Sequence, residues 1–172
     1  MKKDVKKLVL TALFAALTGA LTMVIKIPTP GTGGYIHPGD AMVILCGVIL
    51  GPVYGFFAAG IGSMLADLLG GYFIYVPATF LIKGLVACFA GYLYRTVVEK
   101  NGKPVLGVVF GGIADIVLVA GGYFLFESFL YGIGGAAASV LPNAVQGISG
   151  LVLSLVLYPI LNAIPEVRYM NK

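Results

Sequence analysis

Four ionisable residues lie inside or at the ends of long apolar stretches: Asp67, Lys83, Asp115 and Glu127. Charged groups in such surroundings are costly, and they usually face a cavity or pair with one another. Lys83 follows Pro77 by six residues, so a helix that begins there places the lysine about 9 Å from its start. We expect Glu127 to lie at a similar depth and Asp115, which is deeper, to have a structural role.

Further polar side chains fall close to Lys83 and Glu127 on neighbouring helical turns. They are Thr79, Tyr123, Ser139, Asn143 and Gln146. The glycine-rich segments that adjoin them carry Tyr35, His37, Tyr72 and Tyr75. A cation and amides supply donors and acceptors for a small heterocycle, and the aromatic rings supply stacking faces. The alternative is a structural Lys83–Glu127 pair, with the amides joining helices.

Two motif matches do not predict catalysis. Gly147-Ile148-Ser149-Gly150 resembles the motif of intramembrane serine proteases. A nucleophilic serine needs a base within hydrogen-bond reach, and we expect His37 in a loop far from Ser149. The segment 101–104 lacks the residues of a phosphate-binding loop, and the cysteines show no metal-ligand spacing. We therefore expect no enzyme activity, no ATPase site, no metal and no cofactor.

The composition predicts a membrane protein. Of the 172 residues, 59% are hydrophobic and only 10% are charged, whereas soluble domains carry about a quarter. The many glycines lie inside apolar runs, where they allow close helix packing. Lipid is the solvent that suits such a surface.

Breaks rich in glycine and proline divide the chain into six expected transmembrane helices of a single all-α domain, residues 1–172. The helices are expected at about 8–27, 40–50, 54–69, 78–94, 105–126 and 139–161. We expect flexible loops at 28–39, 70–77 and 128–138 on one side. The other side then carries the Gly51-Pro52 turn and a basic loop at 95–103.

The basic residues set the expected orientation. They gather before the first span, in the 95–103 segment and after the last span. This positive-inside pattern places both termini in the cytoplasm, and it argues against nucleic acid as the partner of the positive charge.

Small residues recur every four positions in the first span, at Ala12, Ala16 and Ala20. This spacing gives one smooth helical face that suits close helix contact. The face either packs inside the protein or docks another membrane subunit.

The chain resembles the substrate-binding S components of energy-coupling factor (ECF) vitamin transporters over nearly its whole length. The resemblance rests on the basic N-terminus with its alanine stripe and on four further segments: 34–40 (GYIHPGD), 50–52 (LGP), 66–72 (ADLLGGY) and 77–85 (PATFLIKGL). The last two are similar to the branch that contains hydroxymethylpyrimidine and pyridoxine transporters.

The resemblance implies a six-helix protein of a prokaryotic cell membrane that binds a vitamin or vitamin precursor in an outer cavity. It implies hydroxymethylpyrimidine or pyridoxine as the substrate, with riboflavin or another vitamin as the alternative. It also implies docking through Ala12, Ala16 and Ala20 on a transmembrane coupling protein (T component), which carries two cytoplasmic ATPases. A homo-oligomeric channel or scaffold is the rival from another class.

Overall fold

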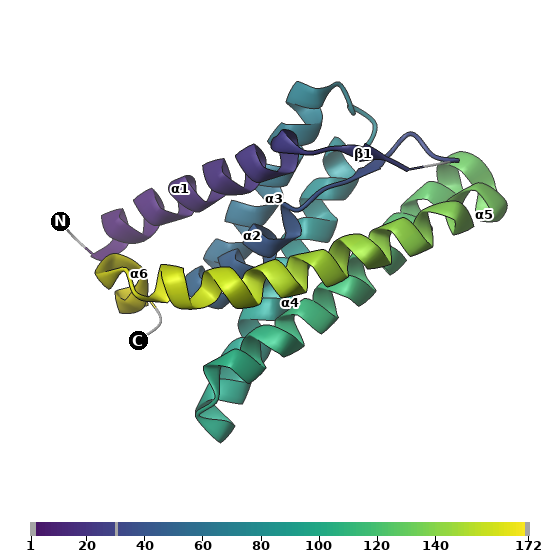
Figure 1. Cartoon of the computed structure of the whole chain (residues 1–172). Coiled ribbons are helices and arrows are strands. Elements are labelled where there is room, and N and C mark those ends of the chain that lie inside the picture. Colours follow the sequence, from purple (N-terminus) through teal and green to yellow (C-terminus); the bar gives the residue numbers. More distant parts are fainter. Residues whose placement is uncertain (1–2, 30, 171–172) are drawn as a thin grey trace.

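The computed structural model describes residues 3–29 and 31–170, and helices make up most of it (Figure 1). In chain order the elements are α1 (Lys3–Val24), β1 (Ile27–Pro28), β2 (Tyr35–Ile36), α2 (Asp40–Leu45), the π-helix η1 (Cys46–Leu50), α3 (Pro52–Gly70), α4 (Val76–Asn101), α5 (Pro104–Asn162) and α6 (Pro165–Met170). The strands form a small antiparallel hairpin in which Ile27 pairs with Ile36.

Prolines and glycines fix the helix boundaries. Pro52 and Pro104 stand in the first turns of α3 and α5, where the missing amide hydrogen costs no intrahelical bond. Gly71 and Gly102 follow α3 and α4 with φ of 82° and 62°, a backbone region that favours glycine. The turn between α4 and α5 is therefore only two residues long.

The centre of the bundle is the continuous helix formed by α2 and η1. Every residue from 40 to 50 is buried, and α1, α3, α4 and α5 all contact this segment. Gly47 makes the close approach to α4 possible, because a Cβ there would overlap the carbonyl oxygen of Ala87. At 1.5 Å per residue the segment rises about 16 Å, roughly half the hydrocarbon thickness of a bilayer. The chain before Asp40 must therefore fill the remaining depth.

The structure corrects three expected boundaries. The first helix ends at Val24 and Ile27 enters the hairpin, so the span is not helical to residue 27. The basic segment 95–103 is not a loop, because α4 stays helical through Asn101. The segment 128–138 is likewise helical except at Gly132, whose φ of 74° and ψ of 167° divide α5 into two segments.

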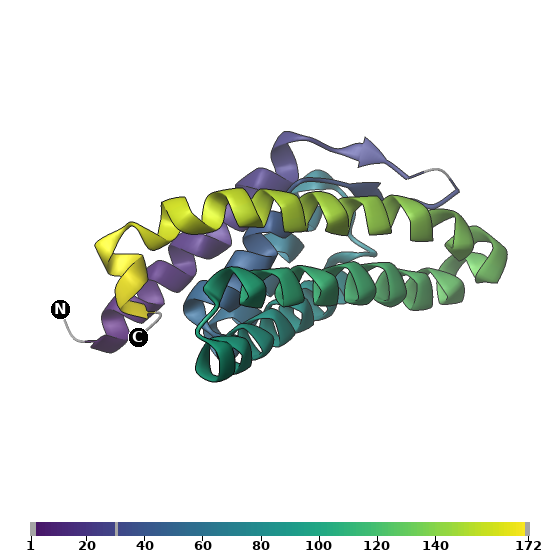
Figure 2. The same cartoon turned by 60° about the horizontal axis from the view of Figure 1, so that its bottom comes forward.

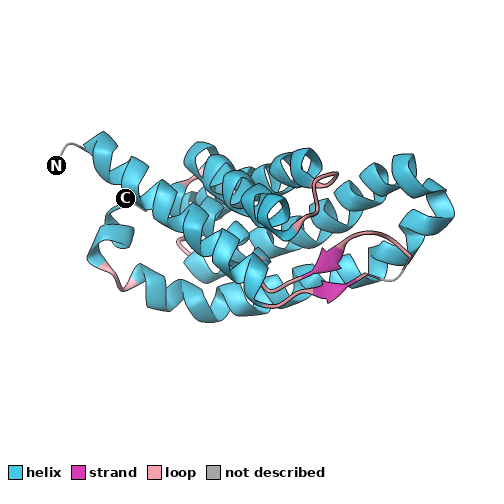
Figure 3. Ribbon diagram, turned by 90° about the horizontal axis from the view of Figure 1, so that it is seen from above, coloured by secondary structure: helices cyan, strands magenta, loops and turns pink. Residues whose placement is uncertain are grey.

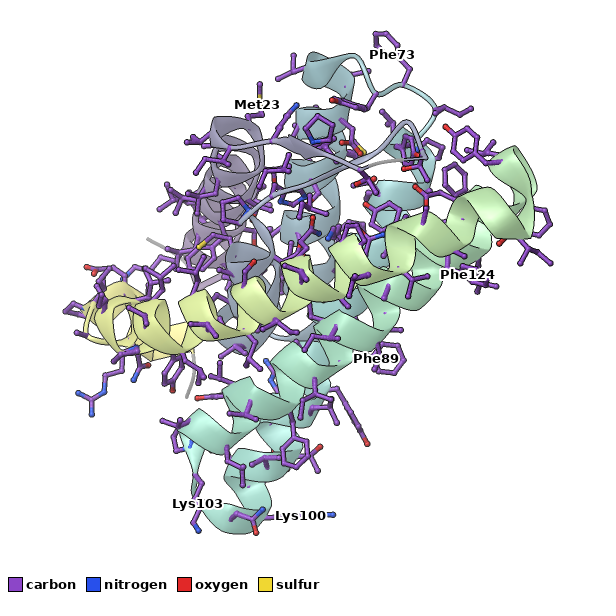
Figure 4. All side chains as sticks on the ribbon, turned by 45° about the vertical axis from the view of Figure 1, so that its right-hand side comes forward. Met23, Phe73, Phe89, Lys100, Lys103 and Phe124 are labelled. Atoms are coloured by element: carbon purple, nitrogen blue, oxygen red, sulfur yellow. The ribbon has the colours of Figure 1, made fainter. Side chains whose placement is uncertain are left out.

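The two sides of the molecule differ in what they carry. Figure 1 shows both termini and the α4–α5 turn along one side, opposite the hairpin, the α3–α4 loop and the bend of α5. In Figure 4, Lys100 and Lys103 lie at one end of the structure and Phe73 at the other. The basic ends of the helices therefore gather away from the hairpin.

The outer surface is largely apolar. Among the described residues, α1, α3, α4 and α5 are long and apolar enough to cross a membrane. Large side chains such as Leu69, Phe129 and Leu141 are more than 70% exposed. Charged side chains would normally cover such a surface in water, so the exposed apolar belt fits a lipid environment.

Candidate functional site

A polar cavity lies between the hairpin and helices α3, α4 and α5. Its lining residues are Thr29, Gly34, Tyr35, His37, Asp67, Tyr75, Thr79, Tyr123, Glu127, Asn143 and Gln146. The space between the lining atoms is about 390 Å³, including the part open to solvent, but the centre of a water molecule can reach only about 20 Å³. A ring-shaped ligand therefore requires the lining side chains to move apart.

A buried ion pair lies beside this cavity. Lys83 Nζ donates to Asp40 Oδ1 at 2.5 Å, and both side chains are fully buried. Gln146 Nε2 donates to the other carboxylate oxygen of Asp40 at 2.7 Å. The pair thus joins the start of the central helix to α4 and to the second segment of α5.

His37 extends this network into the segment before the central helix. Its backbone N–H donates to Gln146 Oε1 at 2.9 Å, and its ring Nδ1 accepts from the Gly39 N–H at 3.1 Å. Both ends of the Gln146 amide are therefore used within the protein. Burial lowers the pKa of His37 to about 3, and the positive charges of Lys83 and Lys26 act in the same direction against the raising effect of Asp40. The ring is neutral at physiological pH.

Two carboxyl groups line the cavity, and tyrosines hold each of them. The Tyr35 hydroxyl donates to Asp67 Oδ1 at 2.7 Å, and the Tyr75 hydroxyl donates to Glu127 Oε1 at 2.9 Å. Burial, followed by the charge of Asp67, raises the pKa of Tyr35, so its hydroxyl stays protonated and donates. The second oxygen of Glu127 is buried and has no hydrogen-bond partner among the described residues.

Neutral polar groups complete the lining. The Thr79 and Tyr123 hydroxyls are 2.8 Å apart across α4 and α5. Asn143 is buried, and in the part of the chain that the structure describes its amide makes no hydrogen bond. The Asn143 amide and the free Glu127 oxygen are therefore the groups best placed to bind a ligand.

The hairpin closes the cavity as a lid. Figure 2 shows it running beside the second segment of α5. A Cβ at Gly33 would lie 2.9 Å from the Tyr131 hydroxyl, and one at Gly34 would lie 3.4 Å from Glu127 Oε1. Figure 3 shows the two strands lying across the surrounding helices. Glycine lets this lid approach its neighbours closely.

The structure brings together eight of the ten expected site residues. Tyr35, His37, Tyr75, Thr79, Tyr123, Glu127, Asn143 and Gln146 all line the cavity. Lys83 does not line it, so its expected place in the binding cavity is wrong. The alternative of a structural Lys83–Glu127 pair is wrong as well, because Lys83 pairs with Asp40. Tyr72 lies outside as well, with its ring 4.4 Å from that of Tyr35.

Four residues of the site were missed. Asp40, Thr29, Gly34 and Asp67 were not singled out as binding residues, although Asp67 was recognised as an ionisable group in an apolar stretch. The signal for Asp40 was the same, a carboxylate that opens an apolar span.

Other polar groups stay outside the site. Asp115 is fully buried, and neither carboxyl oxygen has a hydrogen-bond partner among the described residues. Ser149 and His37 line one shallow groove, so they are closer than expected, but the Ser149 hydroxyl donates to the Gln146 carbonyl at 2.7 Å. Within residues 3–29 and 31–170, no cluster of three or more potential ligands could hold a metal.

A second, apolar groove runs between α1 and α3. Ala12, Ala16 and Ala20 line it and are exposed, while Gly19 of the same helix contacts Gly62 of α3. The centre of a water molecule can reach about 510 Å³ of this groove, and its walls are almost wholly apolar. The alanine stripe therefore faces outward next to the α1–α3 contact.

Sequence comparisons identify relatives of this chain. A family model described as the S component of ECF-type riboflavin transporters matches residues 2–163. The thiamine precursor transporter HmpT of Lactococcus lactis subsp. cremoris is 31% identical over 164 residues, which cover 92% of this chain and 89% of that protein. A protein of Pyrococcus woesei described only as uncharacterized is 38% identical over 132 residues, which cover 77% of this chain and 85% of that protein.

The fold is similar to that of a solved structure. It is described as the structure and mechanism of the S component of a bacterial ECF transporter. The TM-score is 0.66 at 20% sequence identity, and the match covers 94% of this chain and 98% of that one.

The ion pair predicts a large stability effect for one substitution. Lys83→Met leaves the Asp40 carboxylate buried without its counter-charge, which costs about 3–5 kcal/mol. The double variant Lys83→Met/Asp40→Asn removes both charges and recovers most of that loss. The free energy of unfolding in detergent measures both. Equal stability of wild type and Lys83→Met would contradict the assigned pair.

The low pKa of His37 predicts a pH effect on stability. The unfolded chain binds a proton near the ordinary histidine pKa of about 6.5, whereas the folded chain binds it only near 3. Stability contributed by the neutral ring is therefore complete above about pH 6.5 and falls by about 1.4 kcal/mol per pH unit below it.

The chain has a single histidine, which allows a clean control. Between pH 6.5 and 5, His37→Asn should flatten the decline of the thermal unfolding midpoint relative to wild type. Parallel curves for the two proteins would show that His37 titrates normally in the folded state.

Proposed function

This chain belongs to the family of S components of ECF-type transporters, and from that premise we propose that it captures a small heterocyclic vitamin precursor for uptake. S components are transport subunits. The observation that carries the proposal is the cavity under the hairpin, where free groups of Glu127 and Asn143 stand among tyrosine rings. Such a mixture of aromatic surface and a few unsatisfied polar groups is typical of sites for small organic ligands.

The substrate proposed is a thiamine precursor of the hydroxymethylpyrimidine type, or the similar ring of pyridoxine. Support comes from the name of the Lactococcus relative, which is aligned over nearly the whole chain. The description of the matching family model names riboflavin transporters, so riboflavin is the alternative ligand in the same role. The narrow cavity favours a single ring over a fused three-ring system.

The proposed topology has six spans and both termini in the cytoplasm. The spans are α1, α2 with η1, α3, α4 and the two segments of α5 on either side of Gly132. The termini and the basic α4–α5 turn share one side of the molecule, which supports the positive-inside orientation (Figure 1). The cavity then opens to the outside of a prokaryotic cell membrane.

The α1–α3 groove is the proposed docking surface for the transmembrane coupling protein. Ala12, Ala16 and Ala20 leave a shallow path into which a partner helix can pack closely. In this assignment the energy for uptake comes from two cytoplasmic ATPases bound to that partner.

The proposal predicts tight binding of one heterocycle by the isolated protein. A thermal-shift screen of vitamins and precursors should find a ligand that raises the unfolding midpoint. Asn143→Ala should weaken its binding by about 5- to 10-fold, the value of one net hydrogen bond. Asn101→Ala, an exposed position at the end of α4, is the matched control and should bind normally. A screen in which no vitamin or precursor stabilises the protein would contradict the proposed function.

The docking proposal predicts that binding and uptake can be separated. Ala16→Trp fills the groove, so it should leave ligand affinity within about twofold yet abolish uptake and association with the coupling protein, because bulk at a small-residue face prevents close packing. Co-purification and cellular uptake measure the two effects. If the Ala16→Trp variant took up substrate as well as wild type, the assignment of the alanine stripe to the docking interface would be contradicted.

A further inference from the structure

We infer that the cavity selects heterocycles that carry hydrogen-bond donors and no anionic group, so that phosphate esters and carboxylates of the same rings are excluded. The inference rests on the proposed function and specifies the ligand chemistry of that site. It is drawn from the charges and free hydrogen-bonding groups of the lining.

No cation faces the cavity among the described residues. The lining contains neither lysine nor arginine. Lys83, which the sequence suggests as a ligand-binding cation, is fully buried, and its ammonium group pairs with Asp40. Its charge is therefore neutralised within the protein before any ligand arrives.

The remaining basic side chains near the site bring no cation into the lining of the cavity either. The histidine ring is neutral, since burial lowers the pKa of His37 to about 3. Lys26 does not line the cavity; its Nζ lies 4.6 Å from the ring centre of Tyr35 and 5.0 Å from that of Tyr72. The Lys26 ammonium group therefore lies against these two rings and outside the cavity lining.

Acidic side chains, by contrast, face the cavity directly. Asp67 and Glu127 enter from α3 and from the first segment of α5. Glu127 is 2% exposed, and its second carboxyl oxygen has no hydrogen-bond partner within the described chain. A buried polar atom without a partner costs free energy, so a ligand that donates to it gains affinity.

These features act together on ligand choice. An amino or hydroxyl group of a ligand can donate to Glu127, and the Asn143 amide can complete the pattern with a ring nitrogen or oxygen. A phosphate or carboxylate would meet two acidic side chains, and the described lining offers no cation to compensate, so its binding should be weaker by at least about 100-fold. Charge therefore discriminates between ligands of the same ring shape.

Matched ligand pairs test the inference with the purified full chain in detergent. The pairs are 4-amino-5-hydroxymethyl-2-methylpyrimidine and its phosphate, pyridoxine and pyridoxine 5′-phosphate, and nicotinamide and nicotinate. Isothermal titration should show the uncharged member of any bound pair binding at least about 100-fold more tightly. Equal affinity within a pair, to about threefold, would overturn the inference and leave the proposed function standing. Failure of all uncharged rings, riboflavin included, would overturn both.

Two variants assign the effect to the acidic lining. Glu127→Gln should weaken the amino-pyrimidine by about 10- to 100-fold, the range for a hydrogen bond to a charged group. It should also reduce the discrimination against the phosphate. Asp67→Asn, on a different helix, should reduce the same discrimination. Glu99→Gln, an exposed position on α4, is the control and should match wild type. Unchanged discrimination in both cavity variants would overturn the role of the carboxyl groups.

Discussion

The buried contact between Lys83 and Asp40 is the constraint on which the rest of the structure depends. Either charge alone inside an apolar bundle would be strongly destabilising, so the two must be within bonding distance in the folded protein. This requirement fixes the depth of α4 relative to the start of the central helix. Gln146 donates to the same carboxylate and so connects α5 to the ion pair. Its side-chain oxygen accepts from the His37 backbone, which fixes the segment between the hairpin and the central helix. The positions of the elements around the cavity therefore depend on the Lys83–Asp40 ion pair.

The polar cavity and the apolar groove lie in different parts of the molecule. Polar side chains converge under the hairpin, where tyrosine hydroxyls hold Asp67 and Glu127 in place. The α1 face in the groove presents mainly small and apolar side chains, and the hydroxyl of its Thr11 already donates to the Lys7 carbonyl. Helix α3 contributes to both regions, because its Asp67 lines the cavity and its Gly62 meets Gly19 of α1 beside the groove. A ligand that displaces the hairpin would act on the chain that leaves α1, so the two regions are physically connected.

The sequence predicted most of the helices and most of the site, for definite reasons. Prolines and glycines placed the helix boundaries, and polar residues in apolar spans such as Asn143 and Glu127 pointed to the cavity. The family resemblance is confirmed. The partner of Lys83 could not be predicted, because Asp40 is 43 residues away and only the buried central helix brings it close. The helical course of 128–138 was missed because its glycines suggested a loop, whereas only Gly132 leaves helical geometry.

The central claim is that this chain alone holds one small heterocycle in the cavity beneath the hairpin. Native mass spectrometry of the protein purified from cells grown in rich medium tests it directly. The account predicts a single added mass per chain, equal to one uncharged ring compound, which disappears when Glu127 and Asn143 are both replaced by alanine. A chain that carries no small molecule after exposure to vitamins and their precursors, or that retains its ligand in the double variant, would contradict it.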